Sequence, residues 1–87
     1  MSDELNKENI IDLSKRPIEE SIDLFCNTLL LIGFDNVIVK VLGDRFFIIK
    51  GDSFGKSFDA TKLNKDDYKK FHKAISNFCI KNNIDIR

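Results

Sequence analysis

Apolar and polar side chains alternate most clearly between residues 36 and 50, where the pattern predicts a β-hairpin. Two runs rich in β-branched and aromatic residues flank the pair Gly43-Asp44. Glycine adopts the positive φ that a tight two-residue turn requires, and a Gly-Asp pair between such runs is typical of a hairpin. A turn at this pair places Val41 opposite Phe46 and distributes the residues of each strand alternately over two faces.

The two faces of the predicted hairpin differ in composition. The face assigned to the core carries Val37, Val39, Val41, Phe46 and Ile48. The opposite face carries Ile38, Lys40, Leu42, Arg45, Phe47 and Ile49. Because a lone hairpin is barely stable in water, we expect a third strand, and residues 56–60 are the best candidate, after a turn at Gly51 to Gly55.

Helical spacing of apolar residues predicts one helix before the hairpin, over residues 17–32. Pro17 suits the first helical position, and Gly33 is a typical C-terminal stop. The broad apolar face of this helix consists of Ile18, Ile22, Phe25, Cys26, Leu29, Leu30 and Ile32. Leu24 and Leu31 lie together on the opposite flank. This second apolar stripe predicts a second covered surface, and the cover is either another subunit or the N-terminal residues Ile10, Ile11 and Leu13.

A second helix is predicted after the strands. Asn64 is expected to cap its start, with Asp67 at the third helical position, and Asn82-Asn83 is a plausible end. Its narrow apolar stripe consists of Tyr68, Phe71, His72, Ile75, Phe78 and Cys79. Beyond it, Ile84 and Ile86 alternate with polar residues, which predicts either a short edge strand or a segment packed on the core.

The order of the predicted elements indicates an α+β fold. Helix, hairpin, third strand and helix pack most economically in two layers, with a small antiparallel sheet and both helices on one face. The 87 residues allow one modest core. We therefore expect a single α+β domain over residues 17–87, preceded by a partly flexible N-terminal arm over residues 1–16.

The charges of the chain balance to zero but are unevenly distributed. Residues 1–35 hold eight acidic against three basic side chains, a net charge of −5, and residues 36–87 hold six against eleven, a net charge of +5. Zero net charge argues against non-specific nucleic-acid binding as the main function, since counterion release drives that binding. The N-terminus lacks the pattern of a secretory signal, and no apolar run has the roughly 20 residues of a membrane span. These observations predict an intracellular, cytoplasmic protein.

The glycine-containing loop after the hairpin contains two near-matches to catalytic motifs. Three residues separate Gly51 from Gly55, whereas a phosphate-binding loop requires four and must open a helix. Gly51-Asp52-Ser53 resembles the nucleophile block of GDS-type esterases, but the Asp-x-x-His that activates the serine is missing from the chain. A turn between two strands explains the loop better.

The remaining candidates for chemistry have structural explanations. His72 is the only histidine, without a companion at metal-ligand spacing, and it is expected at the margin of the second helix's apolar face. Cys26 and Cys79 are far apart in sequence and are expected to be reduced and buried rather than joined in a disulfide. We therefore expect no enzyme, no cofactor and no metal.

The leading hypothesis is a non-catalytic protein-interaction module. It would be a homodimer, or a small adaptor or inhibitor of a larger protein, of the type found in phages and mobile elements. The surplus of apolar surface motivates it. The expected interaction residues are Ile38, Lys40, Leu42, Arg45, Phe47, Ile49, Leu24 and Leu31. It predicts that Arg45→Glu or Phe47→Ala weakens association without unfolding the domain.

The alternative hypothesis is a nucleic-acid-binding domain. Lys65, Lys69 and Lys73 lie one turn apart on the outer surface of the second helix, where they would contact phosphates together with the cations of the hairpin. The competing explanation is a solvated helix face on which Lys69 and Lys70 pair with Asp66. No membrane and no small-molecule substrate is inferred.

Overall fold

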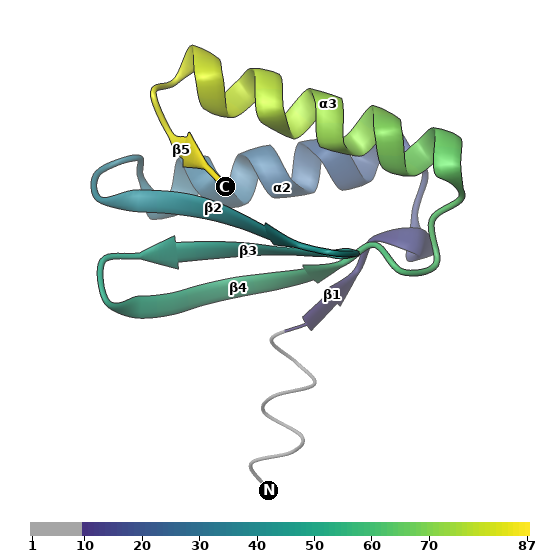
Figure 1. Cartoon of the computed structure of the whole chain (residues 1–87), viewed down its shortest axis with the longest axis horizontal. Helices are drawn as coiled ribbons and strands as arrows, with labels where there is room; N and C mark the ends of the chain where they lie inside the picture. Colours follow the sequence, from purple (N-terminus) through teal and green to yellow (C-terminus); the bar gives the residue numbers. More distant parts are fainter. Residues whose placement is uncertain (1–9) are drawn as a thin grey trace, which may run out of the picture.

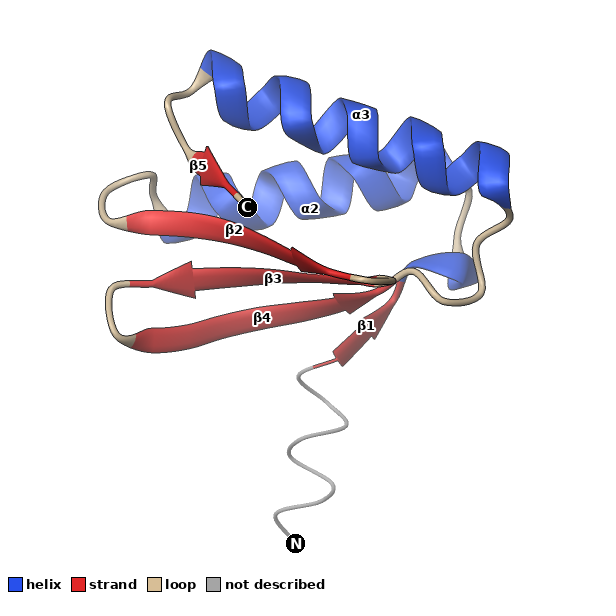
Figure 2. Cartoon of the chain, viewed as in Figure 1, coloured by secondary structure: helices blue, strands red, loops and turns tan. Residues whose placement is uncertain are grey.

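The computed structural model describes residues 10–87, apart from the side chain of Phe54, and it has two layers (Figure 1). The elements follow the order β1 (Ile10–Asp12), the 3-10 turn η1 (Leu13–Lys15), α2 (Ile18–Ile32), β2 (Val37–Leu42), β3 (Arg45–Lys50), β4 (Ser53–Asp59), α3 (Lys65–Lys81) and β5 (Asp85–Ile86). Both helices cover the same face of the sheet (Figure 2). The predicted α+β class with helices on one face is therefore confirmed.

The sheet is larger than the sequence predicts, and it is mixed. Its strand order is β1-β4-β3-β2-β5, in which β2, β3 and β4 are antiparallel neighbours. The two edge strands pair in parallel, β1 with β4 and β5 with β2. The predicted hairpin register is confirmed, because Leu42 pairs with Arg45 and Ile38 with Ile49. Gly43 has φ +57°, as the turn requires.

The third strand begins earlier than expected. The turn before it consists of Gly51 and Asp52 alone, and Gly51 has φ +58°. The register shifts between Ile48 and Ile49, where β4 inserts Gly55 as an extra residue. A Cβ on Gly55 would lie 2.9 Å from the carbonyl oxygen of Ile48, so the bulge brings two backbones too close for a side chain. This bulge accommodates the second glycine of the supposed loop inside the strand.

The two chain ends supply the edge strands. Ile10–Asp12 pairs with residues 57–59, and Leu13, directly after it, is completely buried. Residues 10–15 of the expected arm thus contribute to the sheet and the core, while residues 1–9 lie outside the described part. At the other end, Ile84 is buried and Ile86 pairs with Val39, so the tail packs on the core and also forms a strand.

Both helices begin and end close to the predicted positions. Asn64 caps α3, since its side-chain oxygen accepts a hydrogen bond of 2.8 Å from the backbone N–H of Asp67. Pro17 is the residue before α2 rather than its first helical residue, and its ψ of 148° is extended. Gly33 ends α2 with φ +90°, a conformation that favours glycine.

The core lies between the helices and the sheet, with Phe25 of α2 at its centre. The Phe25 ring centroid lies 4.6 Å from that of Phe58 and 5.7 Å from that of Phe71, and the latter pair is edge-to-face. Ser21 is the one buried polar residue of α2, and its hydroxyl donates a 2.7 Å hydrogen bond to the carbonyl of Leu13. The predicted core face of the hairpin is confirmed, with Val37, Val39, Phe46 and Ile48 buried and Val41 half-buried.

Two assignments on α2 are wrong. Leu30, placed on the core face, is 57% exposed. The buried stripe of α2 runs through Ser21, Phe25 and Leu29, and a step of about 100° from Leu29 turns Leu30 outward. Cover of Leu31 by Ile10, Ile11 and Leu13 is also wrong: Leu31 is 88% exposed, because β1 and η1 pack at the sheet edge and in the core instead. Cover by another subunit stays a prediction. Leu24 itself is half-buried against the core.

Candidate interaction surfaces

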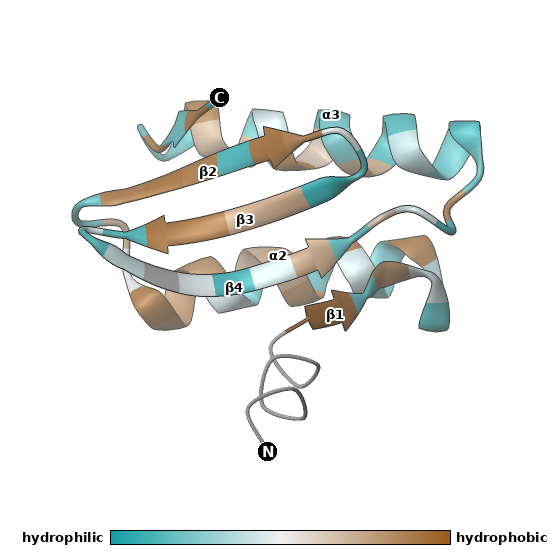
Figure 3. Cartoon of the chain, turned by 60° about the horizontal axis from the view of Figure 1, so that its bottom comes forward, coloured by the Kyte–Doolittle hydropathy of each residue, from teal (hydrophilic) through white to brown (hydrophobic). Residues whose placement is uncertain are grey.

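The sheet face opposite the helices is the first candidate site, and we call it the open face. Residues paired across neighbouring strands share a face, so Lys40, Phe47, Ser57 and Ile10 form one row across four strands. The open face comprises Ile10, Asp12, Ile38, Lys40, Leu42, Arg45, Phe47, Ile49, Ser57, Asp59 and Asp85. Figure 3 looks onto it and shows apolar stretches in β1, β2 and β3, with the helices behind. No described helix or strand lies over it.

The apolar side chains of the open face remain partly accessible. Leu42 is 56% exposed and Ile10 is 40% exposed, while Ile38, Phe47 and Ile49 are half-buried. The structure thus gathers all six hairpin residues that the sequence nominated on one surface. Ile10 joins them, although the sequence placed it near α2, since the pairing of β1 with β4 is a contact between distant segments. Leu24 and Leu31 belong to the helical layer and lie apart from this face.

Acidic and basic side chains of the open face lie on neighbouring strands, since Arg45 of β3 pairs with Asp59 of β4 and Asp85 of β5 lies beside Ile38 of β2. Asp12 and Asp59 are adjacent on β1 and β4, whereas Lys40 and Arg45 lie on β2 and β3. The hydroxyl and backbone N–H of Thr61 both donate to Asp59, which lowers the pKa of that carboxyl, and Arg45 lowers it further. The carboxyl of Asp59 therefore stays ionised at neutral pH.

Ser57 is an unusual member of the open face. It is 4% exposed, and its hydroxyl has no hydrogen-bond partner among the described residues. Its row neighbours, Ile10 and Phe47, flank it on adjacent strands. A buried hydroxyl without a partner costs on the order of 1–3 kcal/mol, so this position marks a destabilising feature within the apolar surface.

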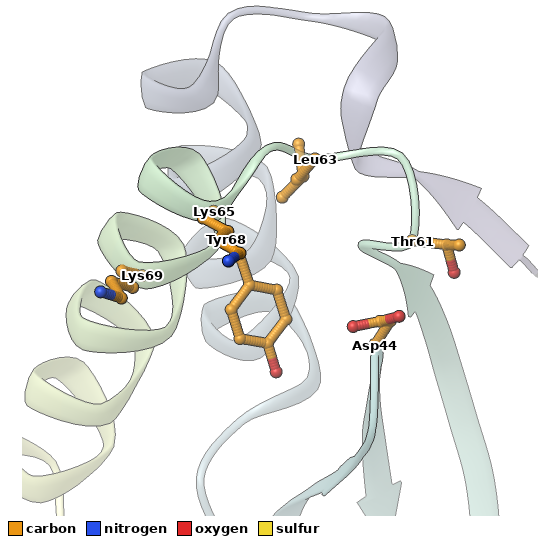
Figure 4. A pocket seen from close by; sticks show the side chains of 6 residues that line it. All are labelled: Asp44, Thr61, Leu63, Lys65, Tyr68 and Lys69. Atoms are coloured by element: carbon orange, nitrogen blue, oxygen red, sulfur yellow. The ribbon is translucent and has the colours of Figure 1, made fainter.

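The second candidate site lies along one side of α3, and we call it the lysine groove. A hollow of about 460 Å³ is lined by Tyr68, Lys69, His72 and Lys73. An adjoining hollow of about 300 Å³ shares Tyr68 and Lys69 with it and adds Asp44, Thr61, Leu63 and Lys65. Figure 4 shows the second hollow, in which Asp44, at the β2–β3 turn, and Tyr68, from α3, extend into the same space. All three lysines of the predicted stripe therefore line these two neighbouring hollows, which together make up the lysine groove.

Two half-buried rings form the wall of the lysine groove. Tyr68 and His72 are stacked with an interplanar angle of 29° and centroids 6.2 Å apart. Both rest on the buried ring of Phe46, at 5.9 and 5.8 Å. The Tyr68 hydroxyl donates a 2.9 Å hydrogen bond to the carbonyl of Gly43, which ties α3 to the hairpin turn. Burial, and then the nearby Asp44, raise the pKa of Tyr68.

The lysines of the groove have no acidic partner in the part of the chain that the structure describes. Lys70 forms an ion pair with Glu19 at 2.6 Å, not with Asp66, so the predicted pairing within the helix is wrong. α2 lies beside α3 and brings Glu19 within reach. Within residues 10–87, Lys65, Lys69 and Lys73 take part in no ion pair. Their positive charge is thus available to a ligand.

The remaining chemistry of the described residues is structural. Burial raises the pKa of the Cys79 thiol to about 11 and also raises that of Cys26, so both thiols are protonated at neutral pH, and both are free. Histidine, cysteine and acidic side chains of the described part do not gather into a metal-binding group. No helix within residues 10–87 is long and apolar enough to cross a bilayer. Comparisons with family models, with curated proteins and with solved structures give no match to this chain.

Proposed function

We propose that this protein is a non-catalytic interaction module that self-associates through its open face. One observation carries the proposal: the sheet face opposite the helices bears five apolar side chains, and no described element lies over them. Clustered accessible apolar surface of this kind is typical of a protein contact. Burying the exposed part of Leu42 and Ile10 against apolar groups would contribute about 25 cal/mol per Å².

The distribution of charge favours a second copy of the chain as the occupant. In a two-fold arrangement whose axis runs parallel to the strands between β3 and β4, β4 of one copy faces β3 of the other. Because Arg45 and Asp59 lie in the same row, Asp59 of one protomer then opposes Arg45 of its partner, twice over. A two-fold interface uses the same patch on both copies, so a surface that carries both signs on neighbouring strands is self-complementary.

The dimensions of the open face set the expected affinity. The three long strands, about 4.8 Å apart and with about 3.3 Å per residue, give a footprint of roughly 14 by 20 Å, to which the short edge strands β1 and β5 add little. Sheets stacked face to face in this way pack about 10 Å apart, with their strands within about 30° of alignment. This area lies at the small end of specific interfaces, so we expect a weak dimer with a dissociation constant in the micromolar range.

Sedimentation equilibrium over a concentration series tests self-association. We expect the average mass to rise from that of the monomer toward twice that value between about 1 µM and 1 mM. Leu42→Glu should remain monomeric throughout, because it introduces an acid at an apolar position of the open face that is 56% exposed. Arg45→Glu is expected to weaken the dimer, since it replaces a cation of the open face with an acid next to Asp59 and Asp12.

Leu31→Glu is the matched control, since it makes the same change on the helical layer, at the most exposed leucine of residues 10–87. Circular dichroism should show both leucine variants folded. A wild-type chain that stays monomeric at 1 mM contradicts self-association, and so does a Leu31→Glu variant that dissociates as completely as Leu42→Glu. If the chain stays monomeric but binds a different protein, and Leu42→Glu abolishes that binding, then the occupant of the open face is that protein and not a second copy.

A further inference from the structure

We propose that the lysine groove is a second, separate binding site and that it takes a short stretch of single-stranded nucleic acid. The groove lies on the helical layer and at the hairpin turn, and it shares no side chain with the open face. Its two hollows are neighbours that share Tyr68 and Lys69 as lining residues, so a ligand that occupies both has to be elongated.

The spacing of the lysines fits phosphates of a nucleic-acid backbone. Lys65, Lys69 and Lys73 recur every four residues, and at 1.5 Å per residue their side chains advance about 6 Å per step along α3. Neighbouring phosphates of a nucleic-acid strand have a similar spacing, because the backbone winds around the axis and their separation exceeds the axial rise of about 3.4 Å per nucleotide. The lysine spacing therefore suits a nucleic-acid backbone, and the aromatic wall is what favours a single strand with accessible bases.

The aromatic wall gives the bases a contact. Tyr68 and His72 are half-buried, nearly parallel, and supported from beneath by Phe46. Bases stack on such rings in single-strand binding sites, at about 1–3 kcal/mol per base, with little dependence on sequence. The hydrogen bond from Tyr68 to the carbonyl of Gly43 holds one ring in place before a ligand arrives, which reduces the ordering cost of binding.

The carboxylate of Asp44 favours a nucleic acid over an acidic peptide as the ligand of the groove. Its carboxylate lies in the second hollow, close enough to Tyr68 to raise the pKa of that phenol. A carboxylate there repels the acids of a peptide, but it accepts hydrogen bonds from the exocyclic amino groups of bases, as acidic side chains do for cytosine. With phosphates on the lysines and bases toward the rings and Asp44, all charged groups of the groove have a partner.

Fluorescence polarisation with labelled 12-nucleotide single strands of DNA and RNA tests the proposal. Neutralising three phosphates of a single strand predicts that affinity falls about 100-fold between 20 and 200 mM salt. Replacing two of the three lysines, as in Lys69→Gln/Lys73→Gln, should weaken binding at low salt and reduce that dependence to about fivefold. The matched control is Lys15→Gln/Lys81→Gln, which removes the same charge at two exposed positions outside the groove and should retain wild-type binding.

Several outcomes would overturn this proposal. Absence of binding by the wild-type chain at 20 mM salt is one, and an equal loss in the control variant is another. A 12-residue polyglutamate peptide or a blunt duplex that binds as tightly as the single strand would show a different ligand class. The monomeric Leu42→Glu variant should bind like wild type, so failure of the open-face dimer and failure of the groove are distinguishable.

Discussion

The two faces of the β2–β3 hairpin are built from similar side chains but have different environments. Phe46 is completely buried beneath the helices, while its neighbour Phe47 is half-buried on the open face. Both faces contain isoleucine together with other large apolar residues, yet only one meets the helical layer. Apolar composition thus makes a sheet face available for burial, whereas the docking of other elements decides which face is buried within the chain.

Alanine substitution at the two neighbouring phenylalanines should give the largest difference in stability between the two hairpin faces. Phe46→Ala removes a ring that contacts Phe25, Phe71, Tyr68 and His72, and we expect it to lower the free energy of unfolding by about 3–5 kcal/mol. For a domain of this size that is a large part of the total stability. Phe47→Ala removes a half-buried ring and should cost about 1 kcal/mol, since only part of its surface is withdrawn from water.

Urea unfolding of both variants gives the measurement, at a concentration low enough to keep the chain monomeric. Ile49→Ala, a half-buried change on the same face as Phe47, serves as a control and should also cost less than Phe46→Ala. If Phe46→Ala and Phe47→Ala lower the free energy of unfolding equally, the two faces are equally buried in the monomer, which contradicts the difference described above.

Ser57→Ala is expected to act in the opposite direction. Removing a buried hydroxyl that has no described partner should raise the free energy of unfolding by about 1 kcal/mol. Ser53→Ala is the control, since Ser53 lies on the same strand but is exposed, and it should leave the stability unchanged. A loss of stability on Ser57→Ala in the dilute monomer would mean that the hydroxyl makes a stabilising contact.

The smallest effect concerns two acidic side chains of the open face. Hydrogen bonds from Ser14 and Thr61 lower the pKa of Asp12 and Asp59 in the folded chain below the usual 3.8. A lowered folded-state pKa adds stability above the unfolded pKa and loses it as the pH falls through the folded value. We therefore expect the free energy of unfolding to decline below about pH 4, and Asp59→Asn should flatten this decline, measured by urea unfolding between pH 2 and 7. A profile that Asp59→Asn leaves unaltered would show that this carboxylate adds nothing.

The central elements of the fold could be predicted because their signals are local. The Gly43-Asp44 turn set the register of β2 with β3, and Asn64 and Gly33 marked helix ends through their own backbone preferences. The edge strands β1 and β5 have three and two residues, too few for a periodic pattern, and their parallel pairing joins segments far apart in the chain. Such contacts carry no local signature, so they could not be derived.

The candidate sites were predictable to different degrees. The six hairpin residues of the open face follow from strand alternation alone, but Ile10 enters only through the pairing of β1 with β4. The lysine stripe on α3 was visible from its spacing. That Lys70 pairs with Glu19, and that Tyr68 bonds to Gly43, depends on how α3 lies against α2 and the hairpin turn.

By itself, the sequence determined the α+β class, both helices, the hairpin register and the core face, since turn residues and apolar periods act over a few neighbouring positions. Only the tertiary structure decided that the helices leave one sheet face open, that Leu30 and Leu31 point outward, and that three lysines and two rings line one groove. The physical reason is that burial and ion pairing depend on which surfaces meet in space. The hairpin supplies two apolar faces, and the helices of this chain cover one of them.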